Sequence, residues 1–118
     1  MPHLMPSHLS TETQSCFNAC LQCWEACEAT FAHCTARGGK HAEPAHLRLL
    51  IDCARACSTA ADFMLRGSDF DGDLCEVCAE ICRQCAEDCE QLDPEDEMMR
   101  ECAAACRRSA EACEGMLQ

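Results

Sequence analysis

The chain has 118 residues, and 15 of them are cysteine. This length allows one domain, and the cysteine fraction lies above that of ordinary globular proteins. The formal net charge of −12 at pH 7 describes a surface that repels phosphate backbones and anionic lipid, so we expect no nucleic-acid and no membrane partner. Only 24 residues are large and apolar, because alanine and cysteine make up most of the hydrophobic fraction. Either the cysteines or something bound to them must therefore fill the core.

Short cysteine-rich chains are usually secreted proteins held together by disulfides, and this is the first interpretation to test. Three features oppose it. The N-terminal segment has neither the basic region nor the apolar region of a signal peptide, an odd number of cysteines leaves one unpaired, and the cysteine spacing is regular. We therefore expect a cytoplasmic protein whose thiols are reduced.

The cysteines fall into four groups, and within each group they recur at steps of three, four or seven residues. Residues at these spacings share one face of a helix, whereas a strand would need steps of two. Ser10 or Thr11 suits the start of the first helix, and Asp93 followed by Pro94 suits the start of the fourth. With the other capping and breaking residues, the predicted helices cover 11–37, 44–66, 71–92 and 94–115.

The connections between these helices are short, which makes successive helices antiparallel neighbours. The predicted fold is all-α, an antiparallel up-down-up-down four-helix bundle with a cysteine-lined core. It would occupy residues 10–118 as a single domain, and we expect residues 1–9 to form a flexible tail.

The cysteine seams of all four helices face the inside of this bundle, so every cysteine is a candidate metal ligand. The predicted ligands are Cys16, Cys20, Cys23, Cys27, Cys34, Cys53, Cys57, Cys75, Cys78, Cys82, Cys85, Cys89, Cys102, Cys106 and Cys113. Two further residues are candidates: His46, which lies on the seam of the second helix, and Asp52, which precedes a cysteine and could add an oxygen ligand.

Thiolate-rich sites select Cu(I), Zn(II) or iron–sulfur clusters. Six C-x-x-x-C pairs place two sulfurs on one helix face, with Cβ atoms about 5–6 Å apart. This arrangement suits Cu(I), which accepts two or three thiolates, and monovalent ions would neutralise buried thiolates at about one ion per sulfur. The sequence thus favours a protein that binds multiple Cu(I) ions. A zinc or cadmium sequestering protein of metallothionein type and an iron–sulfur or redox electron-transfer protein are the alternatives.

With these features, the sequence resembles the cytosolic bacterial copper storage proteins over nearly the whole chain after the tail. The matching segments are Cys16-x3-Cys20-x2-Cys23-x3-Cys27, Asp52-Cys53-x3-Cys57, the Cys75 to Cys89 run, and Cys102-x3-Cys106 through Cys113. The resemblance implies a homotetramer of four-helix bundles that stores Cu(I) on core thiolates and protects the cytosol from copper toxicity. It implies a binding protein and not an enzyme. Separately from the resemblance, a copper chaperone is a candidate partner.

The sequence departs from this family pattern where Thr30, Ser109 and His46 occupy seam positions at which cysteine is expected. These departures predict a lower capacity for copper near those positions. Histidines and methionines are expected at the two ends of the bundle, where either end could admit copper. One end would collect Cys34, His33, His41, His46, Cys89, Met98 and Met99, and the other Cys16, Met64, Cys75, Cys113 and Met116.

Overall fold

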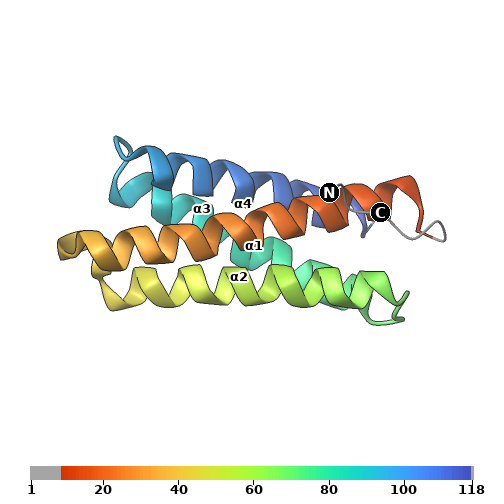
Figure 1. The fold of residues 1–118 in the computed structure, drawn as a ribbon. Helices are drawn as coiled ribbons and strands as arrows, with labels where there is room; N and C mark the ends of the chain where they lie inside the picture. Colours follow the sequence, from red (N-terminus) through yellow and green to blue (C-terminus); the bar gives the residue numbers. More distant parts are fainter. Residues whose placement is uncertain (1–8, 118) are drawn as a thin grey trace, which may run out of the picture.

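The computed structural model describes residues 9–117, and in this part of the chain it contains four long helices. They are α1 (Thr11–Arg37), α2 (Pro44–Leu65), α3 (Asp71–Leu92) and α4 (Glu97–Gly115), with a 3-10 turn, η1 (Gly39–Ala42), after α1. Both α1 and α3 pack against α2 and α4. Figure 1 shows that each helix reverses the direction of the one before it. The predicted fold, an antiparallel four-helix bundle, is confirmed.

The ends of α1 follow from local side-chain and backbone chemistry. The Ser10 hydroxyl accepts a hydrogen bond from the backbone N–H of Thr13 at 3.1 Å, which satisfies one of the free donors at the start of the helix. At the other end, Gly38 adopts φ +72° and donates its N–H to the carbonyl of Cys34. The predicted tail lies outside the described residues except for Leu9, which is buried and accepts a hydrogen bond from Gln14.

The fourth helix begins later than the sequence predicted. Asp93 and Pro94 do not open α4, because residues 93–96 form a turn in which the N–H of Asp96 donates to the carbonyl of Asp93. Asp96 is the N-cap instead, and its carboxylate accepts from the N–H of Met99 at 3.0 Å. Two aspartates in one short connection offered two possible caps, and the turn geometry decides between them.

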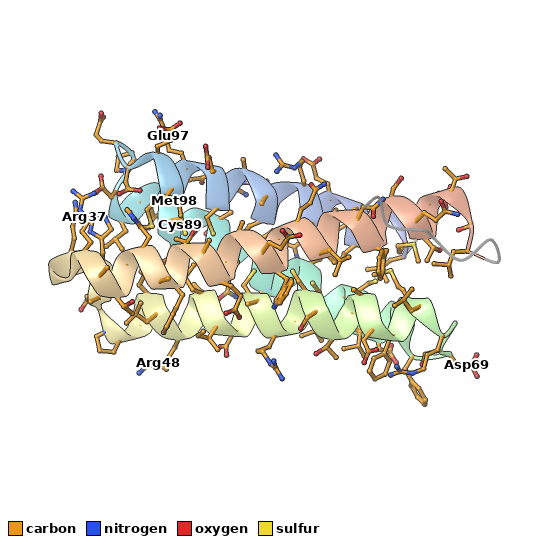
Figure 2. All side chains as sticks on the ribbon, viewed as in Figure 1. Arg37, Arg48, Asp69, Cys89, Glu97 and Met98 are labelled. Atoms are coloured by element: carbon orange, nitrogen blue, oxygen red, sulfur yellow. The ribbon has the colours of Figure 1, made fainter. Side chains whose placement is uncertain are left out.

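The interior of the bundle is built from small side chains. All fifteen cysteines have no exposed surface, and the large residues buried equally deeply are Leu50, Met64 and Met99. In Figure 2, Arg48 and Asp69 project away from the bundle, as charged side chains on its outer faces do. Within residues 9–117, no helix combines the length and hydrophobicity needed to cross a lipid bilayer.

Candidate metal centre

The cysteine side chains of the four helices meet along the axis of the bundle. Nearest sulfur atoms from different helices lie 3.5–3.9 Å apart; examples are Cys57 with Cys82 at 3.5 Å and Cys27 with Cys106 at 3.9 Å. All fifteen are free thiols in the structure. The sulfurs are thus near van der Waals contact, close enough for several to hold one soft ion after small movements.

The sulfurs form overlapping groups in which all members lie within 4.8 Å of one another. The larger groups are Cys23, Cys53, Cys57 and Cys82; Cys23, Cys27, Cys53 and Cys106; and Cys27, Cys85, Cys102 and Cys106. Two smaller groups are Cys16, Cys20 and Cys113, and Cys20, Cys57 and Cys78. Because neighbouring groups share sulfurs, they form one continuous set along the bundle, which we call the thiol column.

Most of these short sulfur contacts cross from one helix to another, which the sequence pattern did not anticipate. The sequence predicted ion binding by C-x-x-x-C pairs within a helix, and pairs such as Cys23 with Cys27, at 4.0 Å, and Cys78 with Cys82, at 3.8 Å, are in contact. The four-thiol groups, in contrast, draw on three helices each. The register between helices sets this arrangement, and the cysteine spacing along one helix does not predict that register.

Ser109 and Thr30 occupy the seam positions that the sequence predicted. Ser109 is fully buried in the thiol column, with its hydroxyl 3.5 Å from the sulfurs of Cys57 and Cys82 and 3.6 Å from that of Cys20. Thr30 is buried on α1 between the positions of Cys27 and Cys34. The serine hydroxyl is a poor ligand for a soft ion, so its place in the column is a position with one fewer sulfur.

His46 stands at the end of the column where α1 finishes and α2 begins. Its Nε2 lies 3.4 Å from the sulfur of Cys34, and that sulfur lies 3.7 Å from the thioether of Met99. Its Nδ1 hydrogen-bonds the carboxylate of Asp88. A carboxylate can only accept, so Nδ1 carries a proton, and in the neutral imidazole Nε2 presents its lone pair to Cys34. Imidazole, thiol and thioether together form a candidate soft-metal site at this end.

The buried thiols resist ionisation as a set. Burial raises the pKa of the Cys34 thiol to about 11, and the negative charge of Asp96 adds to the shift. Deeper in the column, hydrogen bonding with Cys102 and Cys106, together with burial, raises the pKa of Cys27. Hydrogen bonds from Cys106 and Cys27 lower the pKa of Cys102. One thiolate is therefore stabilised by neighbouring S–H donors that stay protonated, and ionising the whole column requires cations.

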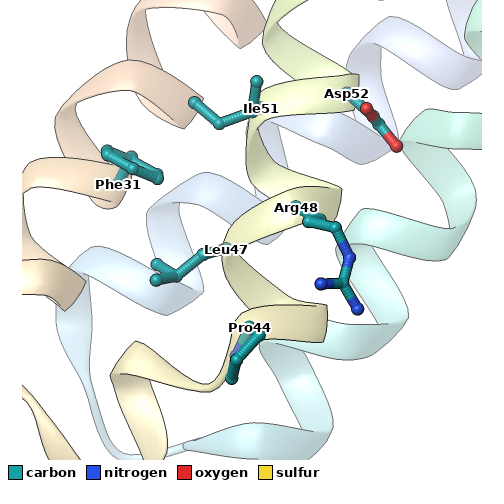
Figure 3. Close-up of a pocket in the computed structure, with 6 residues that line it drawn as sticks. All are labelled: Phe31, Pro44, Leu47, Arg48, Ile51 and Asp52. Carbon is teal, nitrogen blue, oxygen red and sulfur yellow. The ribbon is translucent and has the colours of Figure 1, made fainter.

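Asp52 lies apart from these candidate ligands. Its side chain is exposed on α2 and lines a surface groove with Phe31, Leu47 and Ile51 (Figure 3). The expectation that Asp52 contributes an oxygen rested on its position beside Cys53. Adjacent residues on a helix point about 100° apart, so the buried cysteine turns its neighbour outward.

The structure also brings together residues that sequence reasoning missed or left uncertain. Asp88, which orients His46, is 42 residues away in the chain, and no sequence motif marked it as a site residue. At the same end, His33 faces Asp96 and His41 faces Asp93. Neither histidine is bonded to a thiol. Of the three histidines expected at this end of the bundle, His46 therefore lies beside the thiols, whereas His33 and His41 lie beside aspartates.

The chain is similar to known proteins in both sequence and structure. A family described as copper storage protein matches residues 9–118. A curated relative, the uncharacterized cysteine-rich protein YhjQ of Bacillus subtilis, is 33% identical over 68 residues, which are 58% of this chain and 63% of the relative. The matched segment thus spans less than two thirds of that relative.

Solved structures of high similarity cover nearly the whole chain. The Nmul_A1745 protein from Nitrosospira multiformis is 44% identical, with a TM-score of 0.83 over 90% of this chain and 94% of that protein. Cu(I)-bound copper storage protein BsCsp3 is 31% identical, with a TM-score of 0.85 over 92% of this chain and 100% of that protein. Apo-Csp3 from Bacillus subtilis is also 31% identical, with a TM-score of 0.80 over 90% of this chain and 99% of that one. The chain belongs to the copper storage protein family.

Proposed function

We propose that this protein stores Cu(I) by binding several ions along the thiol column and performs no catalysis. The observation that carries the proposal is the column itself, in which fully buried sulfurs from all four helices form overlapping groups within 4.8 Å. Membership of the copper storage family and the likeness to Cu(I)-bound BsCsp3 support the same conclusion.

The chemistry of the column favours Cu(I) over divalent ions. Thiolates are soft ligands, and an ion with one positive charge neutralises one thiolate, so many ions can be accommodated without building up charge in a buried space. Zinc sites, in comparison, take four ligands around each isolated ion. The column shares its sulfurs between neighbouring groups, which suits a multinuclear cluster more than separate four-ligand sites.

The ligand set that we propose consists of the fifteen cysteines and His46. The imidazole of His46 is fixed by Asp88 and has its Nε2 directed at Cys34, as a metal-binding histidine oriented by a carboxylate would be. Ser109 and Thr30 interrupt the column, so we expect fewer ions per chain than a column with cysteine at those positions would hold. Asp52 is left out because it lies on the outer surface.

Cellular location and assembly are further parts of the proposal. Fifteen reduced thiols persist in the cytoplasm and oxidise outside it, so we place the protein in the cytoplasm. An apolar strip on the α1–α2 face, which includes Phe31, Leu47 and Ile51 together with the partly exposed Trp24, supports assembly into a homotetramer. A copper chaperone is the proposed donor, since free Cu(I) is scarce where thiols are abundant.

The test is an anaerobic titration of reduced apo-protein with Cu(I) in the presence of a strong chromogenic Cu(I) chelator. We expect the protein to take up on the order of one ion per cysteine before the chelator does, because shared thiolates bind soft ions tightly. A parallel sample preloaded with Zn²⁺ should release its sulfur-bound zinc as Cu(I) is added. Uptake of only one or two Cu(I) ions, or retention of zinc bound to sulfur, would refute copper storage.

A further inference from the structure

Beside the thiol column, a second group of potential ligands gathers at one end of the bundle, where η1 meets the connection between α3 and α4. It consists of His33, His41, Asp93 and Asp96, which we call the end cluster. His33 Nε2 lies 2.8 Å from Asp96 Oδ2, and His41 Nε2 lies 3.0 Å from Asp93 Oδ2 and 3.8 Å from Asp96 Oδ2. Four side chains from three segments thus converge through two imidazole nitrogens and two carboxylate oxygens.

His41 is the unusual member of this group. It is only 3% exposed, and its Nε2 makes no hydrogen bond. Among residues 9–117, no other fully buried side-chain nitrogen or oxygen lacks a hydrogen-bond partner. Asp93 Oδ2 is near, but the geometry is not that of a hydrogen bond. A buried nitrogen that faces two carboxylates without a proper donor–acceptor contact is destabilising unless something else binds it.

Three of the separations between these atoms are close to those of ligands around one ion. Two ligands at about 2.0 Å from a tetrahedral Zn²⁺ are about 3.3 Å apart. The three N···O distances, 2.8, 3.0 and 3.8 Å, bracket this value, and the shortest is also a hydrogen bond between His33 and Asp96. We propose that the end cluster binds one divalent cation of the Zn²⁺ type, separately from the Cu(I) column.

The donor atoms of the two regions are of different hardness. Imidazole and carboxylate suit divalent borderline ions, whereas thiolate and thioether suit Cu(I). The division lies between neighbours on α1, because His33 faces Asp96 while Cys34 faces His46 and Met99. Each ion would therefore meet its preferred donors on its own side of the helix.

Arg37 gives the proposal a distinctive consequence. Its guanidinium lies 2.6 Å from Asp96 Oδ2, the same oxygen that His33 contacts, and in Figure 2 it lies at the end of the bundle. An ion at the end cluster would compete with this arginine for the carboxylate. If the cluster is only a set of ion pairs, Arg37 supports it; if it is a metal site, Arg37 weakens binding of the ion.

The first experiment counts Zn²⁺ ions by equilibrium dialysis and identifies their ligands by X-ray absorption at the zinc edge. With Cu(I) filling the column, we expect wild-type protein to bind one Zn²⁺ with nitrogen and oxygen ligands. His41→Gln and Asp93→Asn should lose this ion, whereas Asp62→Asn, at an exposed carboxylate paired with Arg66, should keep it. Equal zinc content in wild type and His41→Gln, or zinc bound by sulfur alone, would overturn the proposal.

The second experiment uses Arg37→Gln, which should bind Zn²⁺ up to about fivefold more tightly than wild type, as expected when an exposed competing ion pair is removed. Unchanged or weaker binding would count against a metal site, and circular dichroism checks that each variant is folded. The wild-type minus His41→Gln difference of one Zn²⁺ is also measured in apo-protein. A failure of copper storage would therefore leave this test intact.

Discussion

The thiol column and the end cluster both contain side chains of metal-binding types, but they differ in the charge that they carry before a metal ion binds. In the column, burial and hydrogen bonding raise the pKa of thiols such as Cys27 and Cys34, and that of Cys34 to about 11. The end cluster is charged, and the carboxylate of Asp96 pairs with Arg37 and faces His33. The column can ionise completely only as cations arrive, so its ionisation is coupled to loading, whereas the end cluster holds its charges in advance.

Removing shared sulfurs should have the largest effect. Cys27 and Cys106 each belong to two of the four-thiol groups. The double variant Cys27→Ser/Cys106→Ser should therefore lose more than two ions, on the order of three or four per chain, because each sulfur serves more than one ion. Cu(I) titration against a chelator measures the loss. The double variant Ala54→Ser/Ala86→Ser, at equally buried sites that carry no sulfur, should keep full capacity. A loss of two ions or fewer in the cysteine variant would contradict the sharing.

Replacing the carboxylate that orients His46 should weaken binding at one end of the column only. Asp88→Asn keeps the shape of the side chain but removes the charge that holds His46 Nε2 toward Cys34. Loss of such a carboxylate lowers metal affinity by about 10- to 100-fold. We expect the most weakly held Cu(I) to be released this much more readily, with the rest of the titration unchanged. An Asp88→Asn curve that overlays the wild type would argue that His46 is not a ligand.

The end cluster should matter more for the stability of the apo-protein than surface ion pairs do. Asp96→Ala removes the N-cap of α4 together with the contacts to His33 and Arg37. Loss of an N-cap costs about 1–2 kcal/mol. Asp62→Ala removes an exposed i,i+4 pair with Arg66 and should cost less than about 0.5 kcal/mol. Urea unfolding of both variants makes the comparison, and equal costs would show that the end cluster is only another surface pair.

The smallest expected effect is on the pH dependence of the apo-protein. Because the folded pKa of Cys34 is raised from 9.0 to about 11, unfolded chains lose this proton first as pH rises. The contribution of Cys34 to the free energy of unfolding has its full value below pH 9 and is lost between pH 9 and 11. Cys34→Ser should therefore lose less stability than wild type across this window, as followed by urea midpoints at each pH. Identical pH profiles for the two proteins would contradict the raised pKa.

Most of the fold could be predicted from the sequence, but few of the contacts between side chains of different helices could. Cysteine spacing and residues such as Ser10, Gly38 and Pro44 are local signals, and local signals are enough to place helices and their inner faces. The start of α4 was misplaced because Asp93 and Asp96 are both plausible caps. The pairing of thiols between helices depends on register.

Within the candidate site, burial of the cysteines and of His46 followed from periodicity, since both lie on the seams. The outward position of Asp52 also follows from periodicity, but its neighbour Cys53 made it look like a ligand. The contact of Asp88 with His46 could not be predicted, because a single sequence does not show which residues 42 positions apart meet in the fold. For the same reason the end cluster, drawn from α1, η1 and the α3–α4 connection, becomes visible only in the structure.

The small side chains of the interior have a consequence for the lifetime of the protein. Leu50, Met64 and Met99 are its few large, fully buried side chains, so the empty bundle buries little large apolar surface to hold its helices together. Every tightly bound ion adds to the free energy of unfolding by mass action. The filled protein should therefore survive proteases longer than the empty one, and the amount of protein in a cell would then follow its copper supply without any change in synthesis.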